Sequence, residues 1–227
     1  MLEGFQRDIA RVVLGVIGPH GFALGGGFAL QEHGIVDRPS TDLDTYVNRF
    51  EREPFERAEV AILDALQERG LDVWVDEEDD VFRRILVHDP RTGDGVRIDV
   101  GFDQRRRPPV LVTGLGPVIH PDDALIGKMN AVVRRRAERD FVDIRAAARS
   151  GRWTPAQFCE LFRQGAPHVS EAERYETLTH AREQDPEEYA ALGLRFEDME
   201  SLFADLERVA DVLANGRSEW EWPDRDR

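Results

Sequence analysis

The segment with the most chemical content lies at residues 25–46, which read "GGGFALQEHGIVDRPSTDLDTY". Three glycines precede a helix-like stretch, and Asp42 and Asp44 follow on a strand-like run with one residue between them. Residues two apart on a strand point to the same side, so the two carboxylates should project together. Neighbouring carboxylates repel each other, and a divalent cation relieves that repulsion. Because Mg²⁺ prefers a few carboxylates together with substrate phosphates, the pair is typical of a metal-dependent phosphoryl-transfer site.

A third acid fits the same scheme. In "VRIDVGF", residues 96–102, the alternating apolar side chains should face the core, so Arg97 and Asp99 share the opposite side. An aspartate within an apolar strand is unfavourable unless something pairs with it. If this strand lies beside the strand of Asp42 and Asp44, the three acids could hold two Mg²⁺ ions, the arrangement that stabilises an in-line phosphoryl displacement. The acids alone are a weak signal, because a chain with 45 acidic residues contains D-x-D patterns by chance.

The glycines make the pattern more specific. Gly26 and Gly27 have no Cβ atom, so a polyphosphate could approach their backbone closely. A helix that begins just after them would favour an anion at its N-terminus. Ser40, two residues before Asp42, has a hydroxyl that could also reach a phosphate. For the glycines alone, an ordinary strand-to-helix turn is the favoured explanation. Glycine turn, helix and D-x-D together are much more specific and indicate a nucleotide site.

The spacing of apolar residues predicts an α+β fold of the mixed α/β kind. The expected helices cover residues 2–17, 28–34, 54–70 and 196–214, and the expected strands cover 21–24, 43–47, 71–77, 81–89 and 96–102. Capping signals at Thr154, Ser170 and Asp185 predict further helices in the second half. We therefore expect a catalytic domain with a small mixed sheet over residues 1–118 and a helical domain over 119–227 that completes the nucleotide site.

Composition narrows the functional classes. The net charge of −15 opposes general binding of polyanions. Arginine clusters at 105–107 and 134–136 indicate either solvated surface or a local docking site for a nucleic acid or nucleotide phosphates. The single cysteine, Cys159, excludes an internal disulfide and a multi-cysteine zinc site. No run approaches the roughly 18 apolar residues of a membrane span, and the charged N-terminal segment does not resemble a signal peptide. A cytoplasmic protein is expected.

The pattern "GGGFAL…DRPSTDLDTYV" followed by "VRIDVGF" resembles the nucleotidyltransferase superfamily related to DNA polymerase beta. Within it, the chain looks most like the AbiEii-type toxin family. The resemblance covers residues 24–47 well, apart from Phe28, where the family usually has a small polar residue. It implies Gly26, Gly27 and Ser40 at the triphosphate, Asp42 and Asp44 on metal, and Asp99 as the third carboxylate.

Two later segments agree with this resemblance. Lys128 in "DDALIGKMNAVVRR" lies among apolar neighbours on one helix face, where a lysine is unusual unless it extends outward to solvent. The family has a lysine on the helix after the catalytic layer, which implies that Lys128 contacts phosphate. "ERDFVDIRAA" resembles the family's R-D-x-x-D segment and implies Asp140 as a site residue, with Asp143 one turn further on. The alternative is surface pairing of both acids with nearby arginines.

The resemblance implies transfer of a nucleoside monophosphate from an NTP to an acceptor, with two Mg²⁺ ions and release of pyrophosphate. Asp42 and Asp44 would hold the metals, Asp99 would help to activate the acceptor hydroxyl, and Lys128 would offset charge on the leaving phosphates. Toxins of this family are thought to modify RNA, including the end of tRNA, and a cognate antitoxin is a possible partner.

Two other functions stay open. Small-molecule nucleotidyltransferases that inactivate aminoglycoside or lincosamide antibiotics have a similar "GG…D-x-D" core. The acidic C-terminal region could seat a polycationic drug by charge complementarity. An inactive scaffold that binds a nucleotide or a partner is the remaining alternative, and the intact set of acids argues against it.

Overall fold

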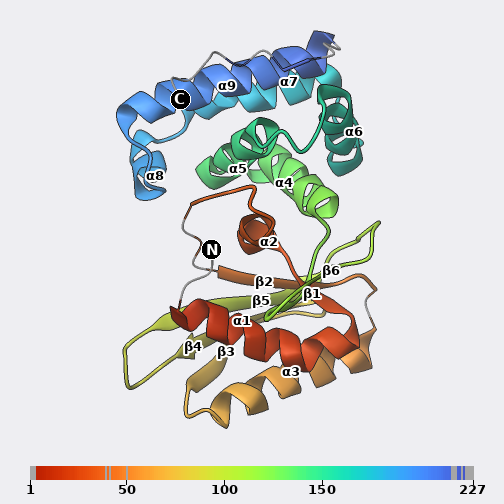
Figure 1. The fold of residues 1–227 in the computed structure, drawn as a ribbon. Helices are drawn as coiled ribbons and strands as arrows, with labels where there is room; N and C mark the ends of the chain where they lie inside the picture. Colours follow the sequence, from red (N-terminus) through yellow and green to blue (C-terminus); the bar gives the residue numbers. More distant parts are fainter. Residues whose placement is uncertain are drawn as a thin grey trace. The chain divides into compact units, whose positions relative to one another are not determined.

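The computed structural model describes residues 4–38, 40, 42–49, 51–215, 219, 220 and 222. The chain forms two compact units that divide between Ala124 and Leu125. The first unit holds a sheet with flanking helices, and the second is helical (Figure 1). The predicted α+β class is confirmed.

The sheet of the first unit is mixed. Its strand order is β3-β4-β5-β2-β1-β7-β6. The strands are β1 (Phe22–Leu24), β2 (Asp42–Val47), β3 (Asp72–Glu78), β4 (Phe82–His88), β5 (Gly95–Phe102), β6 (Val110–Val112) and β7 (Gly116–Val118). β2 pairs with β5 and β1 with β7 in parallel, and the other neighbours are antiparallel. β6 and β7, of three residues each, were not predicted. β1 is equally short, but the glycines that follow it mark its end, whereas β6 and β7 show no alternating pattern.

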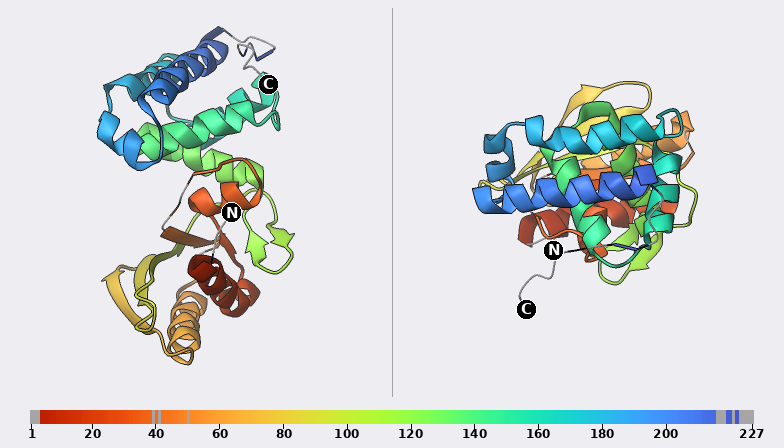
Figure 2. Two further views of the ribbon diagram at one scale, coloured as in Figure 1. Left: turned by 60° about the vertical axis from the view of Figure 1, so that its left-hand side comes forward. Right: turned by 90° about the horizontal axis from the view of Figure 1, so that it is seen from above.

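Three helices accompany the sheet: α1 (Gly4–Ile17), α2 (Gly26–Glu32) and α3 (Arg52–Gln67). α1 and α3 lie side by side on one face, and α2 lies on the other (Figures 1 and 2). The apolar side of α3 is buried as predicted, with Phe55, Ile62 and Leu66 at 2% exposure or less. The ring of Phe55 packs against that of Phe22 on β1 with the centroids 6.0 Å apart. The core therefore lies between the sheet and the α1–α3 pair.

The second unit consists of helices with strong local start signals. α4 (Pro121–Arg135) begins before the division, and α5 (Glu138–Arg149), α6 (Pro155–Gly165), α7 (Glu171–Thr179), α8 (Pro186–Ala191) and α9 (Phe196–Asn215) follow. Thr154 and Ser170 form the predicted capping boxes, and the Asp185 carboxylate caps α8. Cys159 is buried as expected, and burial raises the pKa of its thiol. None of the helices described is long and apolar enough to cross a membrane.

A buried carboxylate joins α9 to α5. Asp205 is 1% exposed and accepts hydrogen bonds from Arg149 Nε at 2.6 Å and Arg145 Nε at 2.8 Å. Burial by itself would raise the pKa of Asp205, but the hydrogen bonds from the two arginines outweigh it and lower the pKa. The folded state therefore favours the charged carboxylate.

Asp205→Asn should lower the free energy of unfolding at neutral pH by about 3 kcal/mol, because it leaves the guanidinium groups of Arg145, Arg149 and Arg208 without their anion. A lowered folded-state pKa stabilises the fold above the ordinary aspartate pKa of about 3.9 and loses that effect as the pH falls further. The difference between wild type and variant should therefore shrink below about pH 4. Urea denaturation followed by circular dichroism at several pH values measures both effects.

Asp211→Asn on the same helix is the matched control and should change stability by less than about 0.5 kcal/mol. Equal stability of Asp205→Asn and wild type at pH 7 would contradict the assignment of Asp205 as the clamp between these helices.

Candidate active site

The acids of the D-x-D pattern lie on the sheet face opposite the core. Leu43 and Thr45 are fully buried on one side of β2, so Asp42 and Asp44 project from the other. β5 is the parallel neighbour of β2, and Asp44 lies in register with Asp99 (Figure 1). The predicted adjacency of the two acid-bearing strands is therefore present.

The glycine turn approaches Asp44 directly. The backbone N–H of Gly25 donates to the carbonyl of Asp44 at 2.8 Å. A methyl group at Gly26 would lie 1.7 Å from Asp44 Oδ2, and Gly26 has a φ of +60°. Both the space and the backbone conformation therefore require glycine here. α2 begins at Gly26 and not at Phe28 as expected, so the glycines form the first turn of the helix.

Ser40 and Arg38 stand beside the next glycine. A methyl group at Gly27 would lie 3.3 Å from Ser40 Oγ and 3.0 Å from Arg38 Nη2. The hydroxyl of Ser40 is thus next to the glycine turn, as its spacing suggested. Arg38 is 8% exposed and was not predicted as a site residue. Its place in the segment "DRPSTDLD", four residues before Asp42, is the signal that could have identified it.

Two arginines offset the charge of the acids. Arg84 lies in register with Asp99 on β4 and donates to both of its oxygens, from Nε at 2.9 Å and from Nη2 at 3.1 Å. Arg97 donates to Asp42, and its Nε lies 3.6 Å from Asp99 Oδ1. The hydrogen bonds with Asp99 raise the pKa of Arg84. In this arrangement Arg97 bridges Asp42 and Asp99, which is the position of a bridging cation.

The donor chemistry of the three acids fits Mg²⁺, since all are carboxylates on one face of neighbouring strands. The described residues contain no group of three or more His, Cys, Asp or Glu side chains already gathered as a metal site. Asp42 and Asp99 are instead held by Arg97. The expected site for two Mg²⁺ ions therefore stays a prediction.

Tyr46 completes this face of β2. A methyl group at Gly25 would lie 2.6 Å from its ring, and its hydroxyl donates to Asp44 Oδ1 at 3.4 Å. Burial and the negative charges of Asp44 and Asp103 raise the pKa of Tyr46 well above its usual value. The phenol therefore remains a proton donor that orients Asp44, a role that the sequence pattern did not reveal.

The predicted residues of the second unit form a buried charge cluster. Lys128 is 7% exposed, and its Nζ lies 2.7 Å from Asp143 Oδ2 and 3.3 Å from Asp140 Oδ1. Arg135 binds Asp140 through Nε at 2.7 Å and Nη2 at 2.9 Å. Both aspartates are 0% exposed, so their expected alternative as surface pairs is wrong.

Burial by itself would raise the pKa of Asp140, but the hydrogen bonds from Arg135 and the charge of Lys128 outweigh it and lower the pKa. Both cations thus favour the carboxylate form. The phosphate contact of Lys128 and the site role of Asp140 stay predictions.

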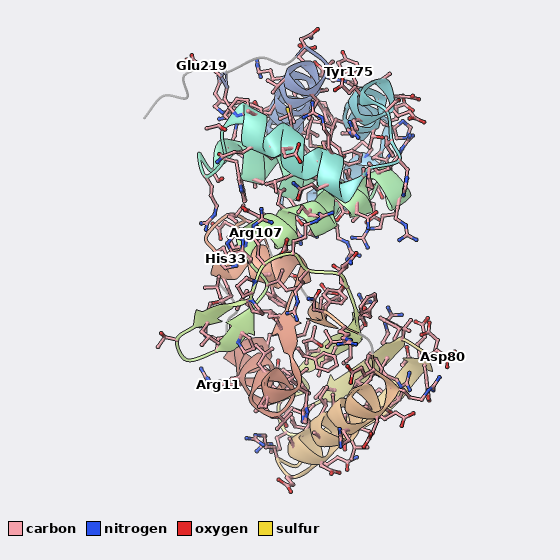
Figure 3. The ribbon with its side chains drawn as sticks, turned by 90° about the vertical axis from the view of Figure 1, so that its right-hand side faces the viewer. Arg11, His33, Asp80, Arg107, Tyr175 and Glu219 are labelled. Atoms are coloured by element: carbon pink, nitrogen blue, oxygen red, sulfur yellow. The ribbon has the colours of Figure 1, made fainter. Side chains whose placement is uncertain are left out.

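Local acids neutralise part of the charge in the arginine clusters. Arg107, labelled in Figure 3, pairs with Asp122 through Nε and with Asp123 through Nη1, each at 3.1 Å. In the second cluster, the ion pair of Arg135 with the buried Asp140 has the same effect. The clusters therefore present less free positive charge than their sequence suggested.

Arg135→Gln should lower the free energy of unfolding by about 1.5–3 kcal/mol, because it removes charge-assisted hydrogen bonds from the buried Asp140. Arg134→Gln changes the neighbouring exposed arginine and should alter stability by less than about 0.5 kcal/mol. Chemical denaturation of both variants measures the difference. Equal effects of the two substitutions would show that the pairing with Asp140 contributes nothing specific.

Two solved structures share the fold of this chain. MenT4, a nucleotidyltransferase toxin from Mycobacterium tuberculosis H37Rv, aligns with a TM-score of 0.62 and 18% identity over 90% of this chain and 81% of that chain. JHP933 from Helicobacter pylori aligns with a TM-score of 0.60 and 16% identity over 92% of this chain and 90% of that chain. At these identities the likeness shows the fold.

The sequence comparison identifies the family. None of the curated proteins matches the chain in sequence. Residues 15–221 match the family described as "Nucleotidyl transferase AbiEii toxin, Type IV TA system". Because this match spans most of the chain, the protein belongs to the AbiEii family of nucleotidyltransferase toxins and is a nucleotidyltransferase.

Proposed function

We propose that this protein transfers a nucleoside monophosphate from an NTP to an RNA acceptor, in a reaction that requires Mg²⁺ and releases pyrophosphate. One observation carries the proposal: the backbone of Gly26 lies against the Asp44 carboxylate, which stands in register with Asp99. This arrangement puts carboxylates from two neighbouring strands beside a turn that carries no side chain. Glycine at this position permits close backbone approach, which a side chain would block.

Asp42, Asp44 and Asp99 would hold the metal, and the bound ions would supply charge neutralisation and alignment of the reacting oxygens. The chain itself would bind the triphosphate through the backbone of Gly26 and Gly27. The Ser40 hydroxyl beside Gly27 would donate to a phosphate oxygen. Arg38 fits the same task, because a guanidinium presents several donors in a geometry that matches phosphate.

The reaction forms a bond between the acceptor oxygen and the α-phosphorus and breaks the bond from that phosphorus to the pyrophosphate oxygen. The acceptor hydroxyl loses a proton, and Asp99 is proposed to accept it. Lys128 and Asp140 are proposed as further residues of the nucleotide site, with the lysine offsetting charge on the leaving pyrophosphate. Their support is the family motif, together with a buried cluster in which charges of both signs are matched.

RNA, in particular the end of tRNA, is proposed as the acceptor, and an antitoxin as the partner. The family supports the antitoxin, since it consists of toxins of type IV toxin–antitoxin systems. The RNA acceptor rests on the resemblance to toxins that are thought to modify RNA. The arginine clusters contribute less than expected, because Arg107 and Arg135 are held by acids of the same unit. The two alternatives are an antibiotic acceptor and an inactive scaffold, and the following assay distinguishes them from transfer to RNA.

The wild-type protein should place label from an NTP on RNA when it is incubated with Mg²⁺, each labelled NTP and total tRNA. Asp44→Asn should reduce the rate more than about 100-fold, since loss of a direct metal ligand should exceed the effect of losing a supporting residue. Asp64→Asn on the exposed side of α3 is the matched control and should leave the rate unchanged.

The same incubation with a panel of aminoglycosides tests the other acceptor class. Label on a drug and not on RNA would establish the antibiotic alternative. Binding of NTP without transfer to either acceptor would establish the scaffold. A melting curve for each variant shows that the loss of transfer does not reflect unfolding.

Arg97→Gln should increase the affinity of the protein for Mn²⁺, a spectroscopic substitute for Mg²⁺, by about tenfold. Arg97 is bound to Asp42 and lies close to Asp99, so a metal must compete with its guanidinium for these oxygens. Electron paramagnetic resonance of free Mn²⁺ measures the affinity without any need for activity. Arg91→Gln, which removes an arginine bound to Asp89 in the β4–β5 turn, should leave the affinity unchanged. Unchanged or weaker Mn²⁺ binding in Arg97→Gln would refute the competition.

A further inference from the structure

A pocket of the first unit lies away from the acids. It has a volume of about 250 Å³ and opens where β1 begins and β2 ends. Phe22 pairs with Val47 at this end, whereas Gly25 bonds to Asp44 at the other. Three residues of strand separate Val47 from Asp44, a distance of about 10 Å. Val47 also belongs to the buried side of β2, which is opposite to the side that carries Asp44.

The floor of the pocket is apolar. Phe22 on β1 and Phe55 on α3 are 1% and 2% exposed, and Val47 beside them is 9% exposed. Each of the three lines the pocket. Such a floor favours a ligand with an aromatic ring or an alkyl chain. The volume lies below the roughly 300–1,000 Å³ of pockets for drug-sized ligands, so a single ring or a short chain fits its size.

Arg105 supplies an incompletely satisfied cation to this pocket. Its backbone N–H donates to Asn48 Oδ1, and its Nη2 donates to the carbonyl of Gly21. Its Nε and Nη1 are buried and have no hydrogen-bond partner among the described residues. Burial lowers the pKa of Arg105, although the charges of Asp123 and Asp103 oppose this effect.

The carboxylate at the rim is already paired. Glu51 Oε1 lies 3.4 Å from Arg49 Nε, so these two rim residues largely neutralise each other. Buried donors without acceptors are unfavourable in a folded protein, and an incoming oxyanion would satisfy them with charge-assisted hydrogen bonds. Arg105 therefore favours a ligand with an anionic group. The apolar floor favours a ligand whose remaining part is an aromatic ring or an alkyl chain.

We propose that this pocket binds a small organic anion. Its carboxylate or phosphate group pairs with the guanidinium of Arg105, which turns on binding so that the buried Nε and Nη1 reach the oxyanion, and its ring or short alkyl chain packs against Phe22, Val47 and Phe55. The site is separate from the one proposed for nucleotidyl transfer, since it lies at the other end of β2 and on the opposite face of the sheet. Its occupation requires neither an NTP nor a metal ion.

The proposal is tested on the full chain without NTP or Mg²⁺ by titrating three probes: 3-phenylpropanoate, phenyl phosphate and the uncharged 3-phenylpropanamide. Nitrogen–proton correlation spectra report the Arg105 Nε–H and the side-chain amide of Asn48. Both signals should shift saturably with at least one of the two anions and not with the amide. Comparison of the carboxylate and the phosphate shows which oxyanion the site prefers. No saturable shift from either anion at about 10 mM, tenfold above a millimolar dissociation constant, overturns the proposal.

Arg105→Gln should weaken binding of the preferred anion by about tenfold or more, since it removes the charge and its donors. Arg106→Gln is the matched control, because it changes the next residue of the same loop and lies outside the pocket lining. Undiminished binding by Arg105→Gln, or equal weakening in both variants, overturns the assignment. If Arg105→Gln does not fold, the proposal is tested by the wild-type protein alone, whose signals should shift with an anion and not with the amide. These readouts do not depend on nucleotidyl transfer, so failure of the transfer assay leaves them interpretable.

Discussion

The first unit depends on how it accommodates three carboxylates on one face of its sheet. The parallel pairing of β2 with β5 puts Asp44 beside Asp99, and Asp42 lies on the same face two residues earlier. Such a concentration of negative charge requires compensation. Arg84 and Arg97 provide it, each from a strand that runs beside an acid. The glycine turn packs directly against Asp44, where any side chain at Gly26 would collide with the carboxylate.

Negative charge in the second unit is also compensated by neighbouring cations. Asp140, Asp143 and Asp205 are all at or below 1% exposure, and each is bound by lysine or arginine. A buried carboxylate is tolerated because these cations and their hydrogen bonds replace the water that it has lost. In the first unit Arg105 presents the reverse case, a buried guanidinium whose Nε and Nη1 have no acceptor among the described residues. The pocket lined by Arg105 therefore differs from the charge clusters of the second unit, in which the buried carboxylates are paired with cations.

Family membership and geometry contribute different parts of the functional conclusion. The family establishes the class of reaction, because its members are nucleotidyltransferase toxins. The geometry adds the residues that this chain would use beyond the motif: Arg38 beside the glycine turn, Tyr46 on Asp44, and Arg97 between Asp42 and Asp99. Arg97 links the two parts, because it lies between two of the carboxylates that are proposed to hold the metal.

The sequence alone determined every feature that depends on short-range periodicity or on local hydrogen bonds. Alternation in β2 and β5 decided which side the acids face, and the capping boxes at Thr154 and Ser170 decided where helices begin. Tertiary structure decided which partners meet. It placed β5 beside β2 in a register that joins Asp44 to Asp99, and it buried Asp140 against Lys128 and Arg135. Local spacing determines which way a side chain points. The charge that neutralises a buried carboxylate comes from the strand or helix that packs against it, and the fold as a whole determines which element that is.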